Sequence, residues 1–120
     1  MKLQVYWSGV AATLDLRERL ERRLAFALGR FGDEVSHVWA QLADANGPRG
    51  GVDKRVSLRV RGRRLKDVRV TDADSSLSTA IDRASDRLGR SIGRALERAN
   101  GHAHGHRDML PERARTLRRR

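Results

Sequence analysis

The feature that most constrains the fold of this sequence is the spacing of its apolar residues, which changes period along the chain. Four segments alternate apolar and polar residues, as strands with one buried face do. They are residues 2–8, 34–44, 55–61 and 65–71. Two others, 15–31 and about 77–99, repeat apolar residues every three or four positions, which predicts amphipathic helices. The predicted element order is therefore β-α-β-β-β-α.

Burial of these apolar faces predicts the architecture. Both helices need an apolar surface, and every strand offers one, so two helices packed on one face of a four-stranded sheet bury all six. We therefore predict an α+β fold of this kind. The opposite sheet face would carry polar and aromatic side chains toward solvent. They are His37, Trp39, Gln41, Arg55, Arg59 and Arg69.

Local signals predict where the elements begin and end. Asp15 with Glu18 resembles a capping box, with Thr13 as the alternative cap, and Gly32 would end the first helix. A turn is expected at 46–51. Leu65 has the wrong parity for the fourth strand, which predicts a bulge or a late strand start near Lys66 and Asp67. Several possible N-caps for the second helix lie at 72–76.

Length limits the chain to one domain. With 120 residues it can build one modest core, and the helical pattern dissolves after Asn100. We therefore expect a folded domain over residues 1–100 and a flexible, basic, His/Arg-rich tail over 101–120. Gly89 and Gly93 should weaken the second helix by up to about 1 kcal/mol each relative to alanine.

The net charge of +11, from 26 basic and 15 acidic residues, indicates a polyanionic partner, with nucleic acid ahead of anionic membrane. All but three of the basic residues are arginine, whose guanidinium binds phosphate bidentately and stacks on bases. The sequence has no cysteine, no apolar stretch near the roughly 20 residues that cross a bilayer, and no secretory signal. We expect a cytoplasmic protein that has no membrane partner.

The strongest candidate site is a row of arginines on the second helix. Its members are Arg83, Arg87, Arg90, Arg94 and Arg98. Their spacing places the guanidiniums along one side of the helix, where like charges repel and a polyanion would relieve the repulsion. Arg22, Arg23 and Arg30 on the first helix would extend the patch if the helices lie side by side. The alternative is a merely solvated basic face whose repulsion is partly relieved by Asp82, Asp86 and Glu97.

Features outside this row give weaker indications of function. Trp39 and His37 could stack on bases from the outward sheet face, or simply cover the sheet. The histidines His102, His104 and His106 could bind a transition metal, but no carboxylate or cysteine accompanies them, so no physiological metal or cofactor is expected. The sequence contains no phosphate-binding loop and no nucleophile elbow, so we predict neither an enzyme nor a small-molecule substrate.

Together with the β-α-β-β-β-α order, three segments carry a resemblance to a known family. They are residues 14–18 (LDLRE), 28–31 (LGRF) and 78–88 (STAIDRASDRL). They resemble the ribosome hibernation promoting factor and ribosome-associated inhibitor A family, also called the sigma-54 modulation protein family. The third segment is similar to its A-I-D-x-x-x-D-[KR]-L signature. One departure is Ser78, which stands where the family usually has an aromatic residue.

The resemblance implies a fold similar to double-stranded RNA-binding domains and a stress-linked role in translation regulation. Such a protein would bind small-subunit ribosomal RNA in the mRNA and tRNA channel and block translation on idle ribosomes. The matching contact residues would be Arg87, Arg90, Arg94 and Arg98, with Arg22, Arg23 and Arg30 also candidates. The chain resembles the short form of the family. The residues alone also allow a general RNA- or DNA-binding regulatory module.

Overall fold

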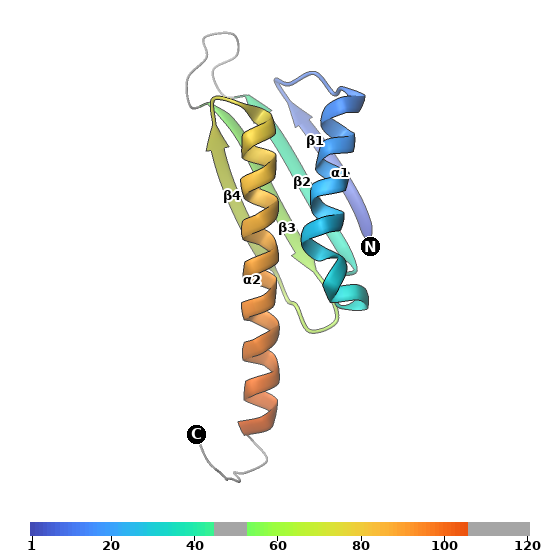
Figure 1. Cartoon of the computed structure of the whole chain (residues 1–120), viewed down its shortest axis with the longest axis vertical. Coiled ribbons are helices and arrows are strands. Elements are labelled where there is room, and N and C mark those ends of the chain that lie inside the picture. Colours follow the sequence, from blue (N-terminus) through green and yellow to red (C-terminus); the bar gives the residue numbers. More distant parts are fainter. Residues whose placement is uncertain (45–52, 106–120) are drawn as a thin grey trace.

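In the computed structural model, residues 1–44 and 53–105 are described, with side chains described as far as Asn100. The chain forms β1 (Lys2–Ser8), α1 (Leu14–Leu28), a 3-10 helix η1 (Gly29–Glu34), β2 (His37–Asp44), β3 (Lys54–Arg61), β4 (Val68–Asp74) and α2 (Leu77–Gly105). This order and the α+β class are as predicted (Figure 1). The turn predicted at 46–51 lies outside the described residues.

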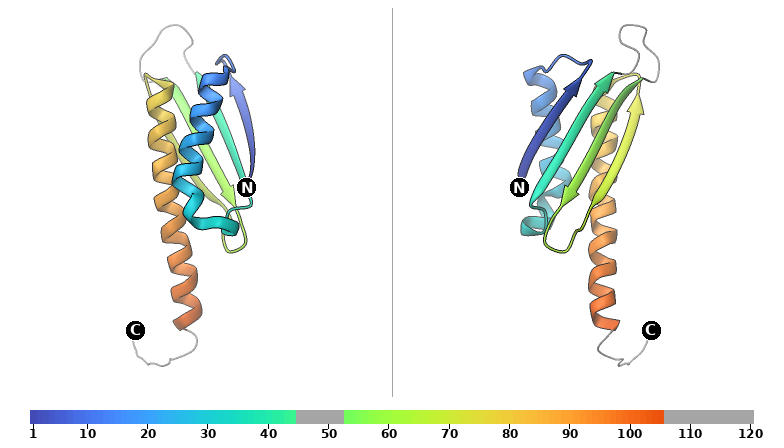
Figure 2. Two further views of the ribbon diagram at one scale, coloured as in Figure 1. Left: turned by 45° about the vertical axis from the view of Figure 1, so that its right-hand side comes forward. Right: turned by 180° about the vertical axis from the view of Figure 1, so that it is seen from behind.

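The sheet has the strand order β1-β2-β3-β4. β1 runs parallel to β2, because α1 carries the chain back to the starting edge, and the other two pairings are antiparallel. Both helices lie against one face of the sheet, and no described helix covers the other face (Figure 2). The fold is therefore two-layered, with one open sheet face.

The core lies between the sheet and the two helices. α1 contributes Leu20 and Leu24, which are fully buried because they occupy one stripe at helical spacing. α2 contributes a longer stripe, and β2 and β3 bury every second residue. The fully buried members of these elements include Ile81, Leu88, Ile92, Val38, Leu42, Val56, Leu58 and Val60. The alternation in the sequence thus predicted the inward face of the sheet correctly.

Several element boundaries differ from the prediction. Thr13 caps α1, because its Oγ1 accepts a hydrogen bond from the Leu16 backbone N–H at 3.2 Å, so Asp15 is not the cap. The predicted end of this helix is occupied by η1, in which Gly32 adopts a φ of 54°. β2 begins at His37 rather than Glu34, because residues 29–34 are taken by η1.

The connection from β3 to β4 confirms the predicted late strand start. β4 begins at Val68, and Leu65 lies before it in the turn, with its side chain 3% exposed. Gly62 and Leu65 close this turn through reciprocal backbone hydrogen bonds. Gly62 packs against the end of η1 so tightly that a Cβ built there would lie 1.6 Å from the Glu34 carbonyl oxygen.

β4 continues to Asp74, three residues beyond the predicted end of that strand at Thr71. Asp72 and Asp74, two of the possible caps of α2, are therefore strand residues. Ser76 caps the helix instead, because its hydroxyl oxygen accepts a hydrogen bond from the Thr79 backbone N–H at 3.4 Å. α2 ends at Gly105 rather than near Ala99, so the first residues of the predicted tail are helical. Residues 106–120, with the rest of that tail, lie outside the described residues.

Candidate nucleic-acid interface

Ion pairs join the two helices along their facing sides. Arg19 of α1 donates two hydrogen bonds to Asp82 of α2, at 3.0 and 2.7 Å. One turn further on, Arg23 reaches Asp86 at 3.1 Å and lies 3.5 Å from Asp82. The hydrogen bond from Arg19 lowers the pKa of the Asp82 carboxyl, with the charges of Arg19 and Arg23 adding to the effect. These acids therefore bind α1 and do not relieve the arginine row of their own helix.

Small residues allow the helices to approach closely at the same joint. Ser85 is fully buried, and a Cβ built on Gly89 would lie 3.0 Å from the carbonyl oxygen of Ala27 in α1. A larger side chain at Gly89 would push the helices apart. The glycine that weakens α2 as an isolated helix therefore brings the two helices into contact.

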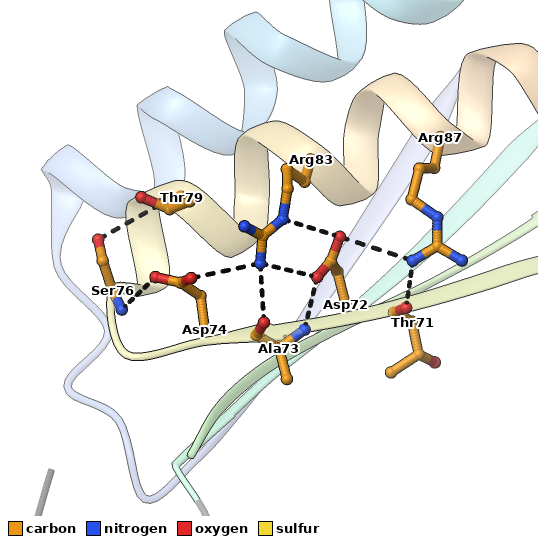
Figure 3. Close-up of polar contacts among 8 residues, drawn as sticks. All are labelled: Thr71, Asp72, Ala73, Asp74, Ser76, Thr79, Arg83 and Arg87. Atoms are coloured by element: carbon orange, nitrogen blue, oxygen red, sulfur yellow. Dashed lines mark hydrogen bonds and ion pairs between the residues drawn. The ribbon is translucent and has the colours of Figure 1, made fainter. Parts of the chain in front are cut away.

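The first two arginines of the row point to β4 and are neutralised there. Arg83 contacts Asp72 at 3.0 Å and Asp74 at 3.3 Å and also donates to the Ala73 carbonyl, while Arg87 donates to the Thr71 carbonyl (Figure 3). The hydrogen bond from Arg83 lowers the pKa of Asp72. Arg83 and Arg87 of the predicted row therefore already have acidic partners, because β4 extends far enough to place Asp72 and Asp74 beside the helix.

The second half of the row remains available. Arg90, Arg94 and Arg98 are exposed, and none of them contacts a carboxylate within the part of the chain whose side chains are described. Arg94 donates to the Ser91 hydroxyl at 3.3 Å. In η1, Arg30 lies over the Phe31 ring with its guanidinium carbon 4.6 Å from the ring centroid.

These guanidiniums meet at a groove between η1 and α2. Arg30, Arg90 and Arg94 line it together with the acid Glu97. A neighbouring hollow toward the start of α2 is lined by Phe26, Arg30, Arg90 and the acid Asp86. We call these two connected hollows, which share Arg30 and Arg90, the helix groove. Three of the predicted site residues are thus brought together from two separate elements.

The other predicted residues occupy less central positions. Arg98 lies two turns beyond Arg90 on α2, and Arg22 is exposed on α1 without a carboxylate partner among the described side chains. Arg23, by contrast, is half-buried and holds Asp82 and Asp86. It stabilises the helix pair rather than presenting a free cation.

Sequence reasoning missed two residues of this region. Arg19 was not among the candidates, although it makes the best-formed contact between the helices. Phe26 is 82% exposed at the wall of the helix groove. The signal for Phe26 was present: it is a large apolar residue lying off the apolar stripe of its helix, and such exposure often marks a binding surface.

The far end of the groove is held by Arg64 from the β3–β4 turn. Its guanidinium binds Glu34 of η1 at 2.6 Å and also donates to the side chain of Asn100 on α2. This contact lowers the pKa of Glu34. The groove walls are therefore fixed to each other at both ends, which suits a rigid surface for phosphate oxygens.

The described part of the chain offers neither a metal-binding cluster nor a membrane-spanning helix. No cluster of three or more histidine, cysteine or acidic residues suited to a metal occurs there, and the side chains of the histidine segment lie outside it. No helix within the described residues is both long and apolar enough to span a bilayer.

Comparison with known proteins places this geometry in a family. The structure matches the N-terminal domain of Thermus thermophilus Protein Y with a TM-score of 0.64 at 27% identity, covering 78% of this chain and 98% of that domain. It also matches a ribosomal subunit interface protein from Coxiella burnetii with a TM-score of 0.67 at 18% identity, covering 81% and 99% of the two chains. Comparison with curated proteins gave no match. The sequence model of the family described as sigma 54 modulation protein / S30EA ribosomal protein matches residues 3–100, and the chain belongs to this family.

Proposed function

We propose that this protein is a ribosome hibernation factor. It binds small-subunit ribosomal RNA in the mRNA and tRNA channel and blocks translation on idle ribosomes. Family membership supports a ribosomal partner, as do the names of the two similar structures, Protein Y and a ribosomal subunit interface protein. In this proposal the protein acts by occupying the channel, without catalysis and without a cofactor.

The observation that carries the proposal is the helix groove, where three guanidiniums lie together and form no ion pair with the described carboxylates, Glu97 of the groove lining included. Arg30, Arg90 and Arg94 line one concave surface, and the nearby acids Asp82 and Asp86 already bind α1. Guanidiniums in such an array bind phosphates of a folded RNA by shape and charge, without reading base sequence. Phe26 adds an apolar contact for a ribose or base at the groove wall.

Sedimentation with ribosomes tests the proposal. The full-length chain should pellet with small subunits and with whole ribosomes at low salt, and should be released as salt rises, because bound cations displace counterions from phosphate. It should also inhibit translation in an extract from which other such factors have been removed. Failure to pellet with ribosomes of the same organism at low salt would refute the proposal.

A charge-matched pair of variants assigns the contact to the helix groove. Replacing Arg90 and Arg94 with glutamate should abolish pelleting while the melting temperature stays near that of the wild type. The control replaces Arg17 and Arg63 with glutamate, because both residues lie outside the groove and the net charge changes by the same amount. Equal loss in both variants would mean that binding follows net charge alone.

A competition experiment separates the proposal from a general RNA- or DNA-binding module. Unlabelled ribosomes should displace the protein from duplex RNA at far lower concentration than an unrelated duplex does. Equal competition by both would favour the general module, because that function requires no preference for ribosomal RNA.

A further inference from the structure

The face of the sheet opposite the helices carries a second basic surface, which we call the open sheet face. Its rows follow from the strand register. One row crosses the sheet as Gln4, Trp39, Arg59 and Arg69, and the row beside it contains Lys2, His37 and Arg61. No described element covers these rows, as the view from behind shows (Figure 2).

Aromatic and guanidinium groups on this face are already stacked. The rings of His37 and Trp39 lie parallel, with centroids 5.2 Å apart and an angle of 14° between planes. The guanidinium carbon of Arg59 lies 5.0 Å from the Trp39 ring centroid. We call these three groups the sheet stack. Tyr6, 54% exposed, lies across a shallow hollow from them.

One carboxylate holds two of the arginines of this face in place. Asp67 accepts from Arg59 at 2.8 Å and from Arg69 at 3.0 Å, and these two hydrogen bonds lower the pKa of Asp67. Asp67 is the carboxylate found beside the cations of this face. The described strands place five cations there: Lys2, Arg55, Arg59, Arg61 and Arg69. The net positive charge is complementary to a polyanion and unsuited to a basic partner.

We propose that the open sheet face binds a single-stranded segment of RNA, one of whose bases stacks on the sheet stack. Aromatic rings and guanidinium planes both accept a base, and flanking arginines hold the phosphates on either side. A duplex hides its base faces, and an acidic peptide offers charge without a planar ring system. This inference extends the proposed function to a second surface, and its contacts are independent of the helix groove.

Fluorescence of Trp39 provides the direct test. In a Trp7→Phe background Trp39 is the only tryptophan, and an unpaired RNA of about 12 nucleotides, within the usual span of single-strand sites, should quench it. Trp39→Ala and Arg59→Ala, in the otherwise wild-type chain, should each weaken binding of the same labelled RNA by about five-fold or more, as loss of a stacked base does. Trp39→Phe should retain most of the affinity.

Two controls accompany this test, and two further variants cover a loss of stability. An abasic strand of equal length should bind weakly without quenching, because it supplies phosphates but no base. The variant with glutamate at positions 90 and 94 should keep the quenching and lose ribosome binding, which separates this inference from the helix groove. If Trp39→Ala or Trp7→Phe melts early, Arg59→Ala and Trp39→Phe in the full chain still decide the affinity.

Three results would overturn the inference. Equal quenching by the abasic strand would mean that the face binds phosphate alone. Displacement of the RNA by poly-glutamate at equal charge concentration would mean that its partner is an acidic protein. Unchanged affinity in both Trp39→Ala and Arg59→Ala, with each variant folded, would equally exclude a stacked base.

Discussion

At the residue scale, one steric contact is decisive for the fold. Gly62 lies where the β3–β4 turn meets η1, and a Cβ there would fall 1.6 Å from the Glu34 carbonyl oxygen, a distance that no side-chain adjustment can relieve. Because the obstacle is backbone, the turn or η1 must move for any other residue to fit. The same turn carries Leu65 into the core and Arg64 to the helix groove.

We therefore expect Gly62→Ala to lower the free energy of unfolding by about 1–3 kcal/mol, as overpacking of a tight site does. Thermal or urea unfolding measures this loss. Gly29→Ala is the matched control, because Gly29 has helical φ and ψ angles and open space around it. The control should be neutral or slightly stabilising. Equal stability of the two variants would contradict the contact at Gly62.

At the element scale, α2 is held by carboxylates on both of its flanks. Asp82 binds Arg19 of α1, and Asp72 of β4 binds Arg83 of α2, so each contact joins different elements. Both carboxyls have a pKa below the ordinary value because a guanidinium donates to the charged form. The association of α2 with its neighbours therefore depends on these groups being ionised.

The stabilisation from such groups is fully present above the pKa of an unfolded aspartate, about 4, and is lost as pH falls through the lower pKa of the folded state. Stability should thus change little with pH between about 5 and 7 on account of these groups, and should fall below about 4. Asp82→Asn should lower the free energy of unfolding by about 1 kcal/mol or less near neutral pH, because the pair is partly exposed. The variant should also lose less stability than the wild type when the pH falls below about 4. Urea unfolding at several pH values measures both effects, with the exposed Asp33→Asn as the control.

The sequence predicted elements better than it predicted the contacts between them. Strand parity and helical stripes depend on local spacing, so the six main elements, the inward residues and the packing of both helices on one sheet face could be predicted directly. The pairing of Arg83 with Asp72 could not, because it depends on β4 running on to Asp74. The sequence identified the arginines of the candidate site but not which of them already have partners.

At the scale of the whole molecule, positive charge is distributed over two opposite surfaces. The helix groove lies on one side, and the open sheet face, with Arg55 and Arg61 at its rows, lies on the other. Asp86 and Glu97 line the helix groove and Asp67 lies beside the open sheet face, but cations outnumber acids at both surfaces. Under the two binding proposals, the protein would contact RNA on both sides at once, which suits the channel of the proposed function.

Salt dependence of ribosome binding measures which arginines contact phosphate. Each phosphate contact contributes about −0.9 to the slope of log K against log salt for a duplex, and somewhat less for single strands. Arg90→Gln with Arg94→Gln should therefore make the slope shallower by about 2. Arg83→Gln should change it little, because Arg83 is bound to Asp72 and Asp74. If Arg83→Gln changed the slope more than the double variant at Arg90 and Arg94 does, Arg83 rather than those two residues would be the phosphate contact.

The ion pairs on the two flanks of α2 also fix its rotation about its own axis. Asp82 and Asp86 hold one flank to α1, while Arg83 and Arg87 hold the other to β4, so neither flank can turn without breaking a contact on the opposite side. The direction in which Arg90 and Arg94 project is thereby set before any ligand arrives. The helix itself therefore has little freedom to lose on docking, so the ordering cost falls mainly on the exposed arginine side chains.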